Sequence, residues 1–157
     1  MKTLVNYITE KFKINSKTIK HRKTIKPKDR FELQNILKER LQDNKDADLN
    51  DIDISEMFTL NFIFQGLDPH NIDISEWDTS NVKHMNGVFY DCKNFNCDLS
   101  NWDVSKVQDM YAMFKGCEKF KGEGIENWKV NHKANMVAMF LACKSLENKP
   151  SWYNETN

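Results

Sequence analysis

Large apolar residues recur along the chain at a nearly constant spacing. Tryptophans follow one another at intervals of 25, 26 and 24 residues: Trp77, Trp102, Trp128 and Trp152. Phenylalanines follow one another at intervals of 25, 25 and 26 residues: Phe64, Phe89, Phe114 and Phe140. A shared period of about 25 residues is typical of a protein built from stacked repeat units, because one unit cannot bury its apolar face alone.

Each unit contains two stretches with different patterns. Residues 73–78, Asp-Ile-Ser-Glu-Trp-Asp, alternate apolar and polar side chains, which predicts a short strand. Met85, Phe89 and Cys92 follow at i, i+4 and i+7, which predicts one face of a short helix, and Ser80 and Ser105 stand where helix N-caps belong. The predicted fold class is therefore α/β, a short right-handed solenoid of strand–turn–helix repeats with an N-terminal helical cap.

The pattern divides the chain into three parts. Residues 1–30 form a basic N-terminal arm with a short amphipathic helix, since Leu4, Ile8 and Phe12 share one helical face. Residues 31–47 are expected to form the cap helix, and residues 48–157 the repeats with a C-terminal cap. The terminal repeats are degenerate, with Ile52 in the tryptophan position, as the caps of a stacked protein require.

Charge is distributed unevenly, although 23 basic and 23 acidic residues balance over the whole chain. Residues 1–47 carry 13 basic and 6 acidic residues, a net charge of +7, and residues 48–157 carry 10 and 17, a net charge of −7. This asymmetry predicts either internal docking or two kinds of partner surface. The basic run 13–30 could neutralise nucleic-acid phosphates, but it lacks the stacking aromatics of single-strand binders.

Composition and segment patterns exclude several classes. With 39% apolar and 29% charged residues, the composition is that of a soluble globular protein. No apolar run is long enough to cross a membrane, and the N-terminus lacks the apolar region of a secretory signal. We therefore expect a location in the cytoplasm of a bacterial host or in a virion, and we expect secretion to be unlikely.

The repeat matches a known pattern. Residues 48–152 follow Asp-Ile-Ser-x-Trp-Asp-(Thr/Val)-Ser-x-Val-x-x-Met-x-x-(Val/Met)-Phe-x-x-Cys-x-x-Phe, which resembles the BspA-type leucine-rich-like repeat of mycoplasma and other bacterial surface lipoproteins. The resemblance implies an α/β solenoid that binds proteins and has no chemistry of its own. Residues 7–15 resemble the openings of small proteins from tailed phages of gut Bacteroidales, which implies a phage or mobile-element origin.

Cysteines and histidines raise the alternative of a zinc site. Cys92 and Cys97 have a C-x4-C spacing, and His84 and His132 could serve as further ligands. The paired ligand spacing of zinc motifs is absent, so buried reduced thiols are favoured, and we expect no metal and no cofactor.

Aspartates also recur with the period of the repeat. Asp48, Asp73 and Asp98 form one column, and a second column follows five residues later. Calcium ligation is one interpretation, but capping of the chain's own turns explains these positions without an ion. The tryptophans are likewise interpreted as packing between units, with an exposed aromatic stripe as the alternative.

Motifs for catalysis and phosphate binding are missing, so we predict a non-catalytic protein-binding repeat module and not an enzyme. The side chains expected to contact a partner lie between the core columns and in the arm: Glu76, Asp78, Asn101, Asp103, Lys106 and Lys129, with Lys20, Arg22, Lys23 and Lys26. The partner is expected to be a protein, with a host-defence protein such as a CRISPR nuclease as the case for a phage-encoded inhibitor. The alternatives are a nucleic-acid-associated protein acting through the arm, a structural or packaged phage protein, and a bacterial surface adhesion protein.

Overall fold

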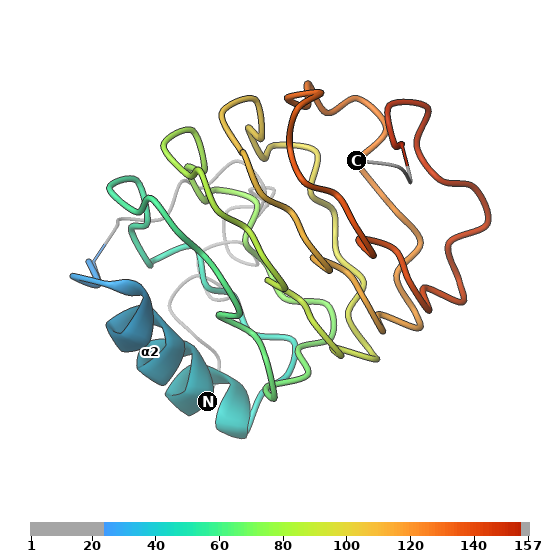
Figure 1. Ribbon diagram of the computed structural model, residues 1–157. Helices are drawn as coiled ribbons and strands as arrows, with labels where there is room; N and C mark the ends of the chain where they lie inside the picture. Colours follow the sequence, from blue (N-terminus) through green and yellow to red (C-terminus); the bar gives the residue numbers. More distant parts are fainter. Residues whose placement is uncertain (1–23, 155–157) are drawn as a thin grey trace, which may run out of the picture.

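The chain winds into coils that stack side by side along one axis, with a helix at one end. A computed structural model describes residues 24–154, and Figure 1 shows helix α2 (Arg30–Gln42) against the first coil. We define coils 1 to 4 as residues 48–72, 73–97, 98–123 and 124–149, and residues 150–154 begin a further turn. No helix in residues 24–154 has the length and apolar content needed to cross a membrane.

The predicted α/β solenoid of strand–turn–helix repeats is wrong. Within the described residues, α2 is the one helix, and it precedes the repeats. The coils contain no extended strands and join through isolated parallel bridges between equivalent residues: Asp48 with Asp73, Thr59 with His84, His84 with Asp109, and Asp109 with Asn135. The repeat period is therefore correct, and the secondary structure assigned inside each repeat is not.

The stretch predicted to be helical is instead a chain of overlapping turns. In coil 2 the Tyr90 and Cys92 amides each donate to the carbonyl three residues earlier, both at 3.0 Å. The amides that alternate with these, those of Phe89 and Asp91, instead donate to carbonyls of coil 3 at 2.9 and 2.8 Å. An α-helix would satisfy these interior amides within its own segment, so this alternation excludes one.

Backbone conformation explains how the turns follow one another. In the turn-rich stretch of each coil, two positions four residues apart have a positive φ: Phe62 and Gly66, Gly87 and Asp91, Ala112 and Gly116, and Ala138 and Ala142. A residue with positive φ interrupts a right-handed helix and produces a tight turn. The predicted N-caps Ser80 and Ser105 therefore precede no helix, and their amides donate to Asp78 and Asp103 at 3.0 and 2.9 Å.

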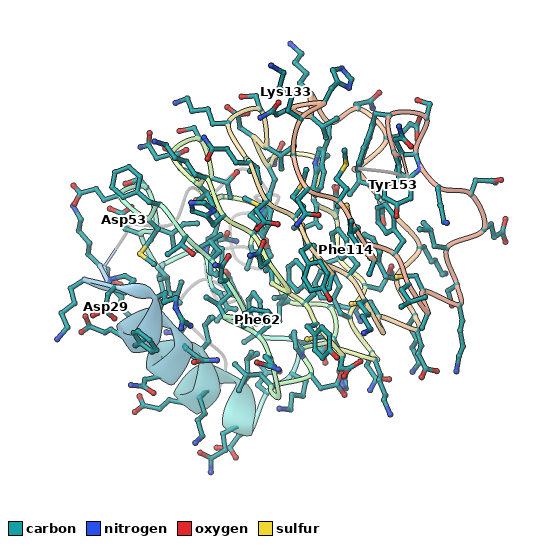
Figure 2. The ribbon with its side chains drawn as sticks, viewed as in Figure 1. Asp29, Asp53, Phe62, Phe114, Lys133 and Tyr153 are labelled. Carbon is teal, nitrogen blue, oxygen red and sulfur yellow. The ribbon has the colours of Figure 1, made fainter. Side chains whose placement is uncertain are left out.

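The apolar columns predicted to form the core are buried. Phe64, Phe89 and Phe114 are inaccessible to solvent, and their rings stack with centroids 5.1 and 5.6 Å apart. Met85 and Met110 are equally buried, four residues before the corresponding phenylalanine. Figure 2 shows Phe114 inside the stack, and the core prediction for these columns is confirmed.

The tryptophan column is also confirmed as packing between coils. Trp77 and Trp102 are 2% and 3% exposed and stack at 6.4 Å. Each indole N–H donates to a carbonyl of the preceding coil, as from Trp77 to Leu49 at 3.0 Å and from Trp128 to Leu99 at 3.1 Å. A buried indole needs such an acceptor, so each tryptophan both fills the core and links two coils.

Helix α2 closes the N-terminal end of the stack. Its residues Leu33, Leu37 and Leu41 lie on one face and are at most 1% exposed, so this face packs on coil 1. Asp29 caps the helix by accepting hydrogen bonds from the amides of Phe31 and Glu32, both at 2.9 Å. The cap satisfies amides that have no partner within the helix.

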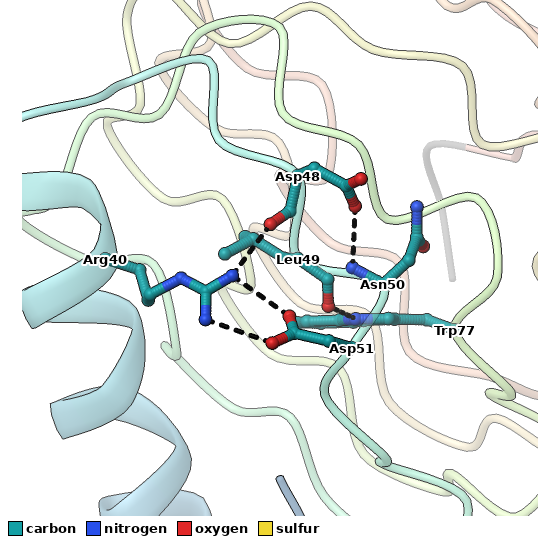
Figure 3. Close-up of polar contacts among 6 residues, drawn as sticks. All are labelled: Arg40, Asp48, Leu49, Asn50, Asp51 and Trp77. Carbon is teal, nitrogen blue, oxygen red and sulfur yellow. Dashed lines mark hydrogen bonds and ion pairs between the residues drawn. The ribbon is translucent and has the colours of Figure 1, made fainter. Parts of the chain in front are cut away.

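Polar side chains of α2 hold the end of the stack in place. Arg40 donates from both terminal nitrogens to the Asp51 carboxylate at 3.0 and 3.1 Å and to the Asp48 carbonyl at 3.0 Å (Figure 3). Gln34 donates to the Phe62 carbonyl at 3.0 Å. A contact through two nitrogens fixes orientation as well as distance, so it holds α2 in one position on coil 1.

Replacing Trp77 with Phe should lower the free energy of unfolding by about 2–3 kcal/mol, because the Leu49 carbonyl loses one of its two donors and the smaller ring leaves a void. Denaturant unfolding followed by circular dichroism measures this loss. The matched control is Tyr111→Phe, since Tyr111 is 41% exposed, and its effect should stay within about 0.5 kcal/mol. Equal effects of the two changes would contradict the role assigned to the indole.

Glycine substitutions distinguish the turns from a helix. Ala142 is exposed with a φ of 63°, so Ala142→Gly should raise the free energy of unfolding by about 0.5–1 kcal/mol through relief of strain. Ala134 has no positive φ, so Ala134→Gly should lower the free energy of unfolding by about 1 kcal/mol. Thermal unfolding of both variants measures the difference, and destabilisation by Ala142→Gly would favour a helical segment.

Candidate protein-interaction surface

The predicted partner residues of the repeat occupy equivalent turns of neighbouring coils. Asp78, Asn101, Asp103, Lys106 and Lys129 are exposed, and Glu76 is half-buried. We call residues 76–81, 101–106 and 127–132 the charged face. Because the coils are in register, these turns lie beside one another along the stack.

Aspartates of the charged face cap their own turns. Asp78 accepts from the Ser80 amide at 3.0 Å, and Asp103 accepts from the Ser105 amide at 2.9 Å. The aspartates of the other column do the same, as Asp98 accepts from the Ser100 amide at 2.8 Å. The turn-capping prediction is therefore confirmed.

Asp103 interacts electrostatically with two lysines that were predicted to contact a partner. Hydrogen bonds from Ser105 hold the pKa of the Asp103 carboxyl below its ordinary value, and the charges of Lys106 and Lys129 lower this pKa further. The carboxylate is consequently ionised at neutral pH and fixed in direction by its turn. The face presents negative and positive charge side by side, from coils 3 and 4.

Asparagines of the charged face have a structural role that the sequence analysis missed. The Asn101 side-chain amide donates to the Ser75 carbonyl at 3.1 Å, and Asn81 donates in the same way to Ser55 at 2.8 Å. The two asparagines are 20 residues apart and hold different positions of the repeat, so the period gave no signal for this role. Asn101 thus links two coils, and its amide nitrogen is already committed to this contact.

Of the four predicted arm residues, Lys26 is the one that the structure describes. Lys20, Arg22 and Lys23 lie outside the described residues. Lys26 is exposed and forms an ion pair with Glu56 at 2.6 Å, and the hydrogen bond from this contact raises the pKa of Lys26.

The residues beside Lys26 pair with coil 1. The Thr24 amide donates to Asp51 at 2.9 Å, and the Asp53 amide donates to Ile25 at 2.7 Å. Ile25 and Ile52 form a parallel bridge. The start of the described chain therefore docks internally, at the first member of the column that continues through Asp78 and Asp103.

The cysteines are buried or half-buried free thiols. Cys117 donates to the Phe89 carbonyl at 2.9 Å, and Cys143 donates to Phe114 at 3.0 Å, so each thiol links two coils. Burial raises the pKa of Cys92, Cys97 and Cys117, and it raises that of Cys143 to about 12. Within residues 24–154, no three histidine, cysteine or acidic side chains gather as a metal site would require.

A polar pocket outside the predicted residues crosses several coils. It has a volume of about 310 Å³ and is lined mainly by His70, Asn94, Asn96, Lys119 and Lys121. His70, Asn96 and Lys121 recur at 26 and 25 residues, so the repeat period carried a signal for this pocket. Sequence reasoning missed it because these positions lie between the apolar columns.

The buried thiols should make stability fall in alkaline solution. Their pKa values are raised in the folded chain, so above about pH 9 the unfolded chain loses thiol protons that the folded chain keeps. Each buried thiol then lowers the free energy of unfolding by up to about 1.4 kcal/mol per pH unit. Urea unfolding between pH 8 and 10 measures this slope. Cys117→Ser keeps a donor of similar size, and it should give a shallower slope; an unchanged slope would contradict the assignment.

Comparison with known proteins defines the family. No curated protein and no solved structure matches the chain. Residues 31–153 match the family described as "Mycoplasma protein of unknown function, DUF285". The match includes nearly all of α2, the four coils, and the Trp152 and Tyr153 rings that pack on the last coil. The chain therefore belongs to the DUF285 family.

Proposed function

We propose that this chain is a non-catalytic protein-binding repeat module of the BspA type. The observation that carries the proposal is a column of outward side chains that changes along a constant backbone. Equivalent exposed positions hold Glu56, Asn81, Lys106 and His132, while the buried columns keep nearly the same residue types. Variation confined to the outside of a repeated frame is typical of surfaces that recognise other proteins.

Rigidity of the charged face supports the proposal. Asp78 and Asp103 are held by bonds to the amides two residues later, and Asn101 ties its turn to the preceding coil. A surface that is ordered before binding loses less conformational entropy when a partner docks. Neighbouring charges of both signs would then set the register of that partner.

A finer form of the proposal concerns the partner. The resemblance of residues 7–15 to openings of phage proteins supports a phage-encoded inhibitor, whose target would be a host-defence protein such as a CRISPR nuclease. In this form the charged face occupies a surface that the nuclease needs for its own substrate.

Removing charge from the face should abolish capture of the partner. Asn can accept the same turn hydrogen bond as Asp, so the double variant Asp78→Asn/Asp103→Asn removes two charges and keeps both turns. The tagged chain is added to a lysate of cells that encode it or host it. The double variant should enrich the partner protein at least tenfold less than the unmodified chain does. Quantitative mass spectrometry measures the enrichment, and the purified prey should bind the unmodified chain directly.

The matched control is Asp98→Asn, which makes the same change in the other aspartate column, where Asp98 also caps its turn. It should leave capture unchanged. Equal loss with the control, or no protein whose capture depends on Asp78 and Asp103, would contradict the proposed function of this face.

A further inference from the structure

The polar pocket is built from all four coils. Its lining residues form two columns that follow the period of the repeat, with Asn71 next to the first: His70, Asn96 and Lys121, and then Asn94, Lys119 and Ser145. The volume of about 310 Å³ lies at the lower end of the range of about 300–1,000 Å³ that is typical of small-molecule sites. The size therefore suits a small ligand or a single side chain of a partner.

Hydrogen bonds between coils fix the backbone around the pocket. The His70 amide donates to the Lys45 carbonyl at 2.8 Å, and the Asn96 amide donates to the His70 carbonyl at 3.1 Å. In the other column, the Lys119 amide donates to the Lys93 carbonyl at 3.1 Å. The backbone of the pocket is thus ordered without a ligand, which lowers the entropy cost of binding one.

The side chains of the pocket offer an excess of hydrogen-bond donors. The side-chain nitrogens of His70, Lys119 and Lys121 have no hydrogen-bond or ion-pair partner among residues 24–154. The side-chain oxygen of Asn96 accepts from the Lys121 amide at 3.0 Å, so its side-chain nitrogen is left as a donor. An imidazole donates in either protonation state, and an ammonium group donates without accepting.

The charge of the pocket differs from that of the repeats around it. Residues 48–157 carry 17 acidic and 10 basic residues, yet no acidic side chain of the described chain lines the pocket. Carboxylates close to the lining residues bond to other groups: Asp68 to Asn94 at 2.8 Å, Asp46 to Asn71 at 3.0 Å, and Glu118 to Lys144 at 2.7 Å. The two lysines of the pocket are therefore left without a counter-ion from residues 24–154.

Unbalanced positive charge and free donors select an anionic ligand. A phosphate monoester carries a charge of about −1.5 to −2 at neutral pH and three strong acceptor oxygens. A carboxylate carries a single charge and two oxygens, so two lysines with two further donors match the phosphate better. The pocket is also larger than a bare phosphate ion, which leaves room for the group that carries the phosphate.

We infer that this pocket binds a phosphate monoester, with Lys119 and Lys121 as the charged contacts and His70 and Asn96 as further donors. Lysine binds phosphate in proteins as a point charge. Two sources share this chemistry, a phosphorylated side chain of another protein and a small phosphorylated metabolite. The pocket lies in other columns than the charged face, so the inference goes beyond the proposed function and does not depend on it.

The test titrates the full chain with four probes at constant ionic strength. N-acetyl-phosphoserine amide represents a phosphorylated protein side chain, and glycerol 3-phosphate represents a small metabolite. Inorganic phosphate and N-acetyl-glutamate amide are the controls for a bare ion and for a carboxylate. NMR of the backbone and asparagine side-chain amides should show saturable shifts at Asn94, Asn96 and Lys121 with at least one ester. That ester should bind at least fivefold more tightly than either control, and the tighter of the two esters identifies the source.

Variants and a matched control test the location. Asn96→Asp keeps an oxygen for the Lys121 amide but replaces the donor with a negative charge, and it should weaken ester binding at least tenfold. Lys119→Gln/Lys121→Gln should have a similar effect. The control Lys83→Gln/Lys133→Gln removes the same charge from two exposed lysines outside the pocket, and it should change binding less than twofold. Circular dichroism confirms that all variants remain folded.

Four results would overturn the inference: no saturable shift at the pocket, equal binding of the carboxylate probe, equal loss of binding in the matched control, or equal binding of inorganic phosphate. The last result would leave a site for the free ion alone. None of these measurements uses the partner captured through Asp78 and Asp103, so this inference and the proposed function stand or fall separately.

Discussion

Amides that alternate along each chain of turns donate to the following coil, and this bonding constrains the whole stack. In coils 2 and 3 the donors bond at 2.8–3.0 Å, which holds equivalent residues in register. Register then places Phe64 over Phe89 and Trp77 over Trp102, at ring separations of 5.1 and 6.4 Å. The aromatic columns and the hydrogen bonds therefore support each other, because neither arrangement satisfies its groups within a single coil.

The same bonding gives the stack a direction. At one end, Arg40 and Gln34 of α2 donate to carbonyls of coil 1, while at the other end the amides of Met136, Ala138, Phe140 and Ala142 donate to no described residue. Natural proteins cover or blunt such edges because an unpaired backbone is a template for another chain. Here the helix covers one edge, and the turn that contains Trp152 and Tyr153 covers only part of the other.

The proposed function rests on the side chains that this bonding leaves exposed. The phenylalanines, methionines and tryptophans are used in packing, and the cysteine thiols bond to carbonyls of the preceding coil. The aspartates of the charged face are held by hydrogen bonds from the amides two residues later. Turn capping and recognition are thus compatible in one residue, and Asp103 beside Lys106 and Lys129 is the clearest case.

The sequence by itself determined the period, the buried columns, the aspartate turn caps and the approximate place of the helix that ends at Gln42, because each depends on residue types at a regular spacing. It could not determine the conformation of the Met-x-x-x-Phe-x-x-Cys stretch, since spacings of four and seven suit a helix and a chain of turns equally. Only the tertiary structure decided this, because the acceptors for Phe89 and Asp91 lie in the next coil, about 25 residues away. The pocket around His70 is likewise formed by neighbouring coils, so the period could suggest its residues but only the stacked coils show that they line one cavity.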